Sequence, residues 1–215
     1  MHEIYKDRVD AGRRLAGAVG ALGLVAPVVL ALPRGGVPVA AELARALQAP
    51  LDLLLAGKIG ARHQPELAIA AVAEGPEPAL VIDEELVGDE QALADVHARV
   101  PEALAELARR RRLYLREREP IPVAGRPVVL VDDGIATGTT IRAALQALRA
   151  RGPARIVLAV PVAPLSQCAA LAGEVDELVC PLQPAWFGAV STFYGDFSQV
   201  SDAAVIAALR AAPQR

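Results

Sequence analysis

The segment of residues 128–140, VVLVDDGIATGTT, constrains the fold of this chain more than any other part of it. Four consecutive apolar residues predict a buried strand, and the Ala- and Leu-rich sequence after the segment predicts a helix. Two aspartates stand where the strand ends, and glycines and threonines lead on into the helix. A strand that continues through a short loop into a helix is the repeating unit of α/β folds. The segment therefore predicts an α/β fold, with this loop at the carboxyl edge of a parallel sheet.

The loop in this segment has the chemistry of a phosphate site. Glycines and threonines before a helix offer backbone N–H groups and hydroxyls, which donate to phosphate oxygens. Asp132 and Asp133 do not suit a phosphate, because like charges repel, but they suit ligand hydroxyl groups or a bound cation. A sugar phosphate matches both halves of the segment. The alternative is an ordinary strand–turn–helix connection in which the aspartate pair is a solvated cap.

Strands and helices alternate along the rest of the chain. Buried strands are expected at residues 28–32, 51–55, 67–73, 79–82, 155–160 and 177–180. Helices are expected within residues 1–24, up to about residue 47, and at residues 165–171 and 202–209. This order predicts an α/β fold with a mainly parallel twisted sheet and helices on both faces. We expect one domain over residues 1–215, with a helical insertion at 83–118 that breaks near Val100-Pro101, and an irregular region at 181–199.

Composition and charge exclude several classes of protein. Hydrophobic residues make up 53% of the chain and aromatic residues 3%, so the core must consist mainly of Ala, Val and Leu. A net charge of −3 argues against general nucleic-acid binding. Cys168 and Cys180 are too few for a disulfide framework and lack the spacing of a metal site, which favours a cytoplasmic protein. The apolar run at residues 15–32 imitates a targeting signal, but acidic residues precede it and Pro27 interrupts it. We therefore expect no membrane partner.

The segment at 128–140 resembles the signature of type I phosphoribosyltransferases, which bind 5-phosphoribosyl 1-pyrophosphate (PRPP). That signature consists of an apolar strand, two acidic residues, a short variable piece and Thr-Gly-x-Thr/Ser. The chain is also similar to a prokaryotic group of phosphoribosyltransferases of unassigned substrate, which combines this segment with Pro-Arg-Gly-Gly, here residues 33–36, and Asp-Phe-Ser-Gln-Val, here residues 196–200. The resemblance implies transfer of the 5-phosphoribosyl group from PRPP to a nitrogen nucleophile, for which a nucleobase is favoured, with release of pyrophosphate.

The resemblance also implies a role for particular residues. The loop that would hold the 5′-phosphate consists of Ala136, Thr137, Gly138, Thr139 and Thr140. Pyrophosphate would be bound by Arg34, Gly35 and Gly36. Asp132 and Asp133 would bind the ribose hydroxyls, directly or through Mg²⁺. Lys58 lies in residues 57–65, where the family has a flexible loop that closes over the active site. The candidate catalytic residues are therefore Asp132, Asp133, Lys58 and Arg34.

Aromatic residues gather in the irregular region at 181–199, where the family has a variable hood over the acceptor. Trp186 and Phe187 are the candidate hood residues, and Phe193, Tyr194 and Phe197 follow them. The alternative is that these rings fill a small satellite core under a long loop. Asp196 could bind an exocyclic donor of the acceptor, or it could cap a turn.

Several assignments stay open at this stage. Enzymes that act on 6-oxopurines usually have an acidic residue at the position where this chain has Ala136. Adenine-type enzymes, like this chain, lack that acidic residue. The acceptor and the general base are therefore unassigned. The arginine-rich residues 109–118 form either a solvated helical face or a surface for a partner. If these arginines form a surface for a partner, the alternative is that the chain is a regulatory protein, which binds PRPP or a nucleotide with little or no catalysis. Relatives are often homodimers, which makes a homodimer possible here.

Overall fold

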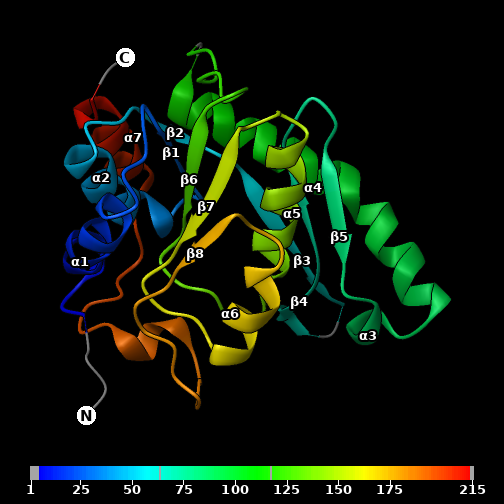
Figure 1. The fold of residues 1–215 in the computed structure, drawn as a ribbon. Helices are drawn as coiled ribbons and strands as arrows, with labels where there is room; N and C mark the ends of the chain where they lie inside the picture. The colour runs from blue at the N-terminus through cyan, green and yellow to red at the C-terminus, as the bar shows by residue number, and fades with distance from the viewer. Residues whose placement is uncertain (1–4, 63, 117, 214–215) are drawn as a thin grey trace. The chain divides into compact units, whose positions relative to one another are not determined.

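The computed structural model describes residues 5–62, 64–116 and 118–213 of the chain. The chain forms two compact units. The first unit comprises residues 1–53, 119–136 and 153–215, and the second comprises residues 54–118 and 137–152. Figure 1 shows both units in one ribbon, coloured along the chain. The chain passes from the first unit to the second between Ala136 and Thr137, within the signature segment.

The first unit contains a parallel sheet of five strands in the order β2-β1-β6-β7-β8. The strands are β1 (Val28–Ala31), β2 (Leu51–Leu53), β6 (Pro127–Val131), β7 (Arg155–Ala159) and β8 (Glu177–Val179). Every neighbouring pair in this sheet is parallel. The parallel sheet expected from the alternating strands and helices is therefore confirmed.

Helices cover both faces of this sheet. They are α1 (Arg8–Gly20), α2 (Gly36–Ala46), α6 (Leu165–Ala172) and α7 (Asp202–Ala211), with a 3₁₀ turn η1 (Val190–Phe193). In Figure 1, α1 and α2 lie on one side of the sheet and α6 on the other. All four residues of β1 are completely buried. Burial on both faces explains why β1 and residues 128–131 of β6 are continuous apolar runs in the sequence.

The strand order changes direction between β1 and β6. From β1 the chain continues to β2 on one side, whereas β6 is followed by β7 and β8 on the other side. The Leu32 N–H donates to the Val131 carbonyl at 2.9 Å, so the two strands stay paired up to their carboxyl ends. In open parallel sheets, ligands bind beyond the carboxyl ends of the strands at such a point. A ligand site is therefore expected at the loops that follow β1 and β6.

The second unit contains an antiparallel sheet in the order β3-β4-β5. Its strands are β3 (Ala56–Ala61), β4 (Gln64–Ala73) and β5 (Ala79–Ile82), and its helices are α3 (Glu84–Val87), α4 (Glu90–Leu115) and α5 (Thr139–Arg149). One of its cores consists of alanines from β4, β5 and α5, namely Ala71, Ala73, Ala79, Ala143 and Ala147. Small side chains let a helix and a sheet approach closely, which suits an Ala-rich sequence.

Residues 57–62 and 64–65, the described part of the expected flexible loop, are mainly strand. Most of them belong to a hairpin, in which Ala56 pairs with Ala73 and Ile59 with Ala70 across β3 and β4. Ile59 is buried, which anchors the strand in spite of its polar and glycine-rich neighbours. Main-chain pairing and burial of one side chain thus outweigh the local preference for a loop.

Residues 84–87 and 90–115 of the predicted insertion are helical, but the predicted break near Val100-Pro101 is wrong. The helix α4 continues through Pro101, and the chain is interrupted instead at Gly88, which has a φ of +72°. Val96 and Leu107, on the two sides of the proline, are buried. Packing on both sides of Pro101 stabilises the helix across the one hydrogen bond that a proline cannot donate. No helix within the described ranges has the length and apolar character needed to cross a membrane.

Candidate active site

The loops that follow β1 and β6 lie against each other in the first unit. A Cβ atom added to Gly35 would lie 2.0 Å from Oδ2 of Asp133, and one added to Gly36 would lie 2.9 Å from Cα of Asp132. Gly35 has a φ of −60° and a ψ of −39°, which any residue adopts, so close approach is what requires glycine here. The structure thus brings the Arg34–Gly36 loop and the two aspartates together at the carboxyl edge of the sheet.

The carboxylate of Asp133 is held by a partner that the sequence does not single out. Arg8, the first residue of α1, donates from Nε to Oδ2 of Asp133 at 2.7 Å. Burial raises the pKa of Asp133, and the ion pair with Arg8 opposes this rise. No motif distinguishes Arg8 among the 22 lysines and arginines of the chain. Arg8 and Asp133 are 125 positions apart in the sequence, so only the folded structure shows their contact.

The main chain around the two aspartates is also fixed by hydrogen bonds. The Asp133 N–H donates to Oδ1 of Asp132 at 2.8 Å, and the Tyr194 hydroxyl donates to the Asp133 carbonyl at 2.5 Å. A Cβ atom on Gly134 would lie 2.5 Å from Cγ1 of Val190, so the region after β8 packs directly on this loop. The end of β6 is therefore held from two sides within the first unit.

Arg34 lies at the surface of its loop. The peptide bond between Pro33 and Arg34 is cis. Nη1 of Arg34 lies 3.6 Å from Oδ1 of Asp202, the first residue of α7, and both side chains are more than a third exposed. An exposed ion pair of this length contributes little stability. The guanidinium can therefore turn to an anionic ligand at low cost.

The threonine-rich loop lies at the start of residues 137–152, the second of the two segments that form the second unit. Gly138 is the N-cap residue of α5 and has a φ of +80°, in the left-handed region that favours glycine. Because this residue is glycine, no cap side chain competes for the first amides of the helix, and these can donate to an anion. The hydroxyl oxygens of Thr137 and Thr139 lie 3.3 Å apart, and Thr139 is buried. This arrangement suits a phosphate group.

The predicted hood residues differ in their surroundings. Phe187 is partly buried and stacks on Phe193, with ring centroids 5.3 Å apart, in a cluster that includes Tyr5 and Tyr194. Phe187 therefore belongs to a satellite core, the alternative interpretation. Trp186 is 84% exposed, and its ring is accessible to a ligand.

Asp196, in the same region, caps a turn. Its Oδ1 accepts the Ser198 N–H at 2.8 Å, and this hydrogen bond lowers the pKa of the Asp196 carboxyl. The turn-capping interpretation of this residue is the one that the contacts support.

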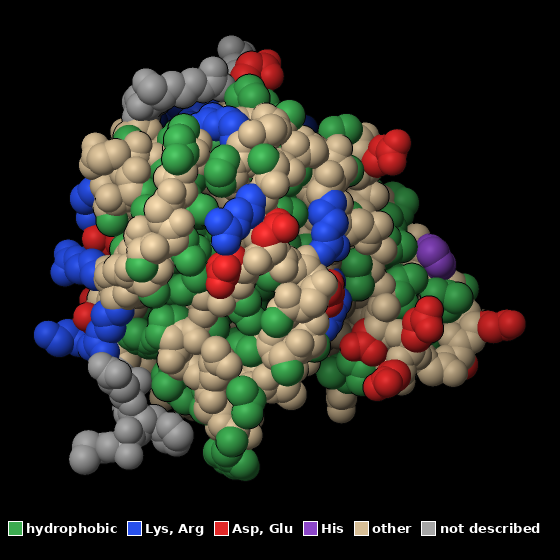
Figure 2. All heavy atoms as spheres, viewed as in Figure 1, with side chains coloured by type: hydrophobic (Ala, Val, Ile, Leu, Met, Phe, Trp, Pro, Cys, Tyr) green, Lys and Arg blue, Asp and Glu red, His purple; other side chains and the backbone are tan. Residues whose placement is uncertain are grey.

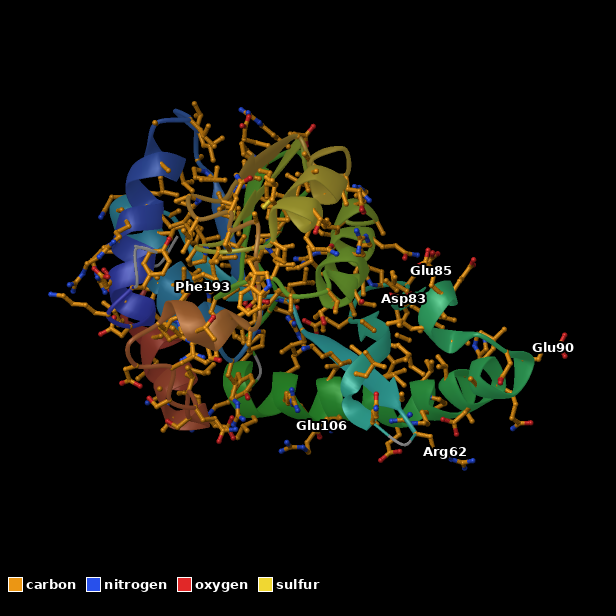
Figure 3. All side chains as sticks on the ribbon, turned by 90° about the horizontal axis from the view of Figure 1, so that it is seen from below. Arg62, Asp83, Glu85, Glu90, Glu106 and Phe193 are labelled. Atoms are coloured by element: carbon orange, nitrogen blue, oxygen red, sulfur yellow. The ribbon has the colours of Figure 1, made fainter. Side chains whose placement is uncertain are left out.

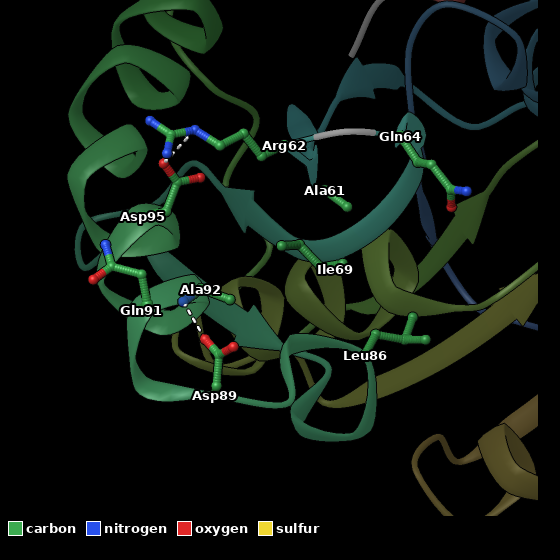
Figure 4. Close-up of a pocket in the computed structure, with 9 residues that line it drawn as sticks. All are labelled: Ala61, Arg62, Gln64, Ile69, Leu86, Asp89, Gln91, Ala92 and Asp95. Atoms are coloured by element: carbon green, nitrogen blue, oxygen red, sulfur yellow. Dashed lines mark hydrogen bonds and ion pairs between the residues drawn. The ribbon is translucent and has the colours of Figure 1, made fainter.

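Lys58 lies on β3 in the second unit, where it is exposed and pairs with Ala71 of β4. The same unit has a pocket of about 520 Å³ beside the end of the hairpin, which Figure 4 shows in close-up. Ile69 and Leu86 give it apolar walls, and Arg62 and Asp95 form an ion pair of 3.7 Å at its rim. Lys58 does not line this pocket.

Comparison with known proteins decides the family. The family model described as the phosphoribosyl transferase domain matches residues 3–194, most of the chain. The chain belongs to the phosphoribosyl transferase domain family. The resemblance drawn from the signature segment is thereby confirmed.

Two of the similar proteins match this phosphoribosyl transferase domain over almost its whole length. A Mycobacterium tuberculosis protein, named provisionally as a phosphoribosyl transferase, is 47% identical over 208 residues, which make up 96% of this chain and 46% of that protein. The chain thus spans about half the length of the curated relatives it matches. The bifunctional protein PyrR of Roseiflexus is 64% identical over 42 residues, 19% of this chain and 23% of that protein. The crystal structure of TT1426 from Thermus thermophilus is 43% identical, has a TM-score of 0.80, and is matched over 96% of this chain and 97% of that one.

The donor set of this phosphoribosyl transferase domain fits a magnesium ion that the substrate helps to hold. Among the residues that the structure describes, no three His, Cys, Asp or Glu side chains lie close enough together to hold a metal ion. Asp132 and Asp133 offer two adjacent carboxylates. Mg²⁺ commonly binds through one or two carboxylates, with water and substrate phosphates as its other ligands.

The arginine-rich end of α4 pairs with carboxylates within the second unit. Arg109 and Arg110 both donate to Glu106, and Arg111 donates to Glu74 at 2.6 Å. The hydrogen bonds from Arg109 and Arg110 lower the pKa of Glu106 to about 2. Glu106 lies at the helix surface in Figure 3, and the space-filling view of Figure 2 shows acidic side chains at the other end of the unit, around α3 and the start of α4. These pairs favour the solvated, charge-laced face over a surface for a partner.

Proposed function

We propose that this protein is a Mg²⁺-dependent phosphoribosyltransferase. It transfers the 5-phosphoribosyl group from PRPP to a nitrogen nucleophile, for which we favour a nucleobase, and releases pyrophosphate. The observation that carries the proposal is the direct packing of Gly35 and Gly36 on Asp133 and Asp132 where the strand order reverses. A loop shaped for an anion beside two carboxylates matches a ligand that combines pyrophosphate with vicinal hydroxyl groups.

Each part of PRPP has proposed partners in this chain. The 5′-phosphate binds the hydroxyls and amides of the loop from Ala136 to Thr140, at the N-terminus of α5. The ribose hydroxyls bind Asp132 and Asp133. Pyrophosphate binds the guanidinium of Arg34 and the amides of Gly35 and Gly36, because a planar guanidinium matches paired phosphate oxygens. Lys58 neutralises charge on the leaving group, and Trp186 stacks on the acceptor.

The reaction is a substitution at the anomeric carbon. The lone pair of the nucleophile forms the new C–N bond, and the C–O bond to pyrophosphate breaks with its electron pair on the leaving oxygen. Positive charge grows on the ribose as this bond breaks, so catalysis depends on positioning and on charge stabilisation by Asp132 and Asp133. Asp132 and Asp133 would hold a bound Mg²⁺, which would supply charge neutralisation to the pyrophosphate. Ala136 cannot accept the proton of the nucleophile, so that base lies elsewhere.

Two substitutions test the assignment of the acidic pair. Asp132→Asn and Asp133→Asn remove one negative charge each with little change of shape, and we expect PRPP affinity to fall by about 100-fold or more. Isothermal titration calorimetry with PRPP and Mg²⁺ measures this loss. Glu85→Gln, which removes the same charge from an exposed residue of α3, is the control and should leave the affinity unchanged. Unchanged PRPP affinity in both Asp variants refutes the assignment.

Release of pyrophosphate distinguishes catalysis from regulation. Incubation of the protein with PRPP, Mg²⁺ and a panel of nucleobases should release pyrophosphate with at least one acceptor. Tight PRPP binding without turnover on any acceptor would instead establish the alternative, a PRPP- or nucleotide-binding regulator. The proposal further includes the action of residues 1–215 as one domain and a cytoplasmic location. It also includes assembly as a homodimer, and sedimentation of the purified protein tests this assembly.

A further inference from the structure

Arg8 is fixed by three different partners in the first unit. Its Nε donates to Oδ2 of Asp133 at 2.7 Å, and its Nη1 donates to the Ser198 carbonyl at 2.8 Å. Its guanidinium carbon lies 3.8 Å from the centroid of the Phe197 ring. Only 11% of the Arg8 side chain is exposed. A planar guanidinium with two hydrogen bonds and one stacked face has little freedom left.

The Asp133 carboxylate is enclosed between Arg8 and Gly35. Gly35 leaves so little space that a single added carbon would overlap Oδ2, the oxygen to which Arg8 donates. A carboxylate has about four acceptor positions, and the Arg8 bond occupies one of them. The remaining positions can accept hydroxyl groups of a ligand while the plane of the carboxylate stays fixed. Asp132, the other charged group beside this carboxylate, is held to the Asp133 amide.

The other two partners of Arg8 come from a part of the chain that the proposed reaction does not use. Phe197 and Ser198 belong to the Asp-Phe-Ser-Gln-Val sequence at residues 196–200. The turn capped by Asp196 sets the Ser198 position, and Tyr194, just before it, contacts both Phe197 and the Asp133 carbonyl. The C-terminal region thus reaches the acidic pair through Arg8.

We infer that Arg8 is a positioning residue for recognition of the ribose. It holds the Asp133 carboxylate in the orientation that accepts a ribose hydroxyl, and Phe197 and Ser198 hold Arg8 in turn. This inference rests on the proposed function, because it assumes that Asp133 binds the ribose. The competing explanation is an ion pair that serves only the stability of the fold.

The experiment separates the two ends of the ligand. Ribose 5-phosphate and pyrophosphate, each with Mg²⁺, are titrated calorimetrically into the wild type, Arg8→Gln, Arg8→Lys and a control. The control is Arg13→Gln, which removes the same charge from the same helix at a residue that pairs with Glu42 and is 68% exposed. Arg8→Gln should weaken ribose 5-phosphate about tenfold, as expected for loss of one charged hydrogen bond, and change pyrophosphate by less than about twofold.

Arg8→Lys keeps the charge but cannot make all three contacts, so it should recover part of the affinity for ribose 5-phosphate. The inference fails if Arg8→Gln binds ribose 5-phosphate as the wild type does, or if it weakens both ligands equally. A wild type that binds neither ribose 5-phosphate nor PRPP overturns the proposed function and this inference with it. If Arg8→Gln does not fold, Phe197→Leu is the test. Loss of the stacked ring should weaken the binding of ribose 5-phosphate and leave the binding of pyrophosphate unchanged. If Phe197→Leu binds ribose 5-phosphate as tightly as the wild type does, Arg8 has no positioning role.

Discussion

Replacing Gly35 with alanine adds one methyl group to the closest contact in the candidate site. The new Cβ would lie 2.0 Å from Oδ2 and 2.6 Å from Cγ of Asp133. Carbon atoms and their neighbours normally approach to about 3.5 Å, so the carboxylate must move by about 1.5 Å. A shift of that size breaks the 2.7 Å hydrogen bond from Arg8. The backbone itself is not strained, because the φ of Gly35 is −60°.

The expected effect has two parts. Loss of a hydrogen bond between charged groups lowers the free energy of unfolding by about 1.5–3 kcal/mol. Alanine also lowers the entropy of the unfolded chain, which raises the free energy of unfolding by about 0.4–1 kcal/mol. We therefore expect Gly35→Ala to lower the free energy of unfolding by about 0.5–2.5 kcal/mol. The displaced carboxylate also loses its proposed hydrogen bonds to the ribose hydroxyls, and a loss of about 1.5–3 kcal/mol corresponds to a fall in PRPP affinity of about 10- to 100-fold.

Urea unfolding and calorimetric titration with PRPP measure the two effects. Gly17→Ala is the matched control, because a Cβ atom on Gly17 in α1 meets nothing within 4 Å. This control should be more stable than the wild type by about 0.5–1 kcal/mol and should bind PRPP unchanged. If Gly35→Ala unfolds like the wild type and binds PRPP with the same affinity, the argument from close packing at this loop is wrong.

Two further substitutions test contacts away from the loop. The folded-state pKa of Glu106 is lowered from 4.5 to about 2 by hydrogen bonds from Arg109 and Arg110, so these bonds add stability above pH 4.5 that disappears as the pH falls towards 2. Because Glu106 is 38% exposed, Glu106→Gln should lower the free energy of unfolding at pH 7 by less than about 1 kcal/mol. It should also make the free energy of unfolding less dependent on pH between 4.5 and 2. If urea unfolding shows the same pH dependence in Glu106→Gln and the wild type, these hydrogen bonds do not contribute. Asp52 is buried and accepts the N–H groups of Leu53 and Ile121. Asp52→Ala removes both buried hydrogen bonds and should lower the free energy of unfolding by about 2–4 kcal/mol. A loss below about 1 kcal/mol in urea unfolding would show that other acceptors satisfy these amides.

The sequence predicts β1 and β6 because both strands are buried between two covered faces. Residues such as Val128 and Val129 are completely buried, and a strand buried on both sides must be apolar throughout. The second unit was harder to predict. Its β3 strand contains Gly57, Lys58 and Gly60, whose local preferences favour a loop, and only pairing with β4 makes this segment a strand. The break predicted at Pro101 failed for a similar reason, since packing of α4 overrides the preference of one residue.

The candidate site shows the same division. Arg34, Gly35, Asp132 and Asp133 are predictable because each follows an apolar strand, and the carboxyl ends of parallel strands share one edge. Phe187 was equally consistent with a ligand site and a core, since an aromatic residue in an irregular region suits both. Its stacking on Phe193 depends on how the chain after β8 folds back, which has no local signal.

The sequence by itself determined the family, the parallel sheet and the two loops at its edge, because burial and glycine-rich turns leave local patterns. The tertiary structure alone decided which groups surround those loops. Arg8 lies 125 positions from Asp133 in the chain and contacts it because the fold brings the start of α1 beside the end of β6. An ion pair between distant residues leaves no periodic pattern, since its energy depends on distance in space and not on spacing along the chain.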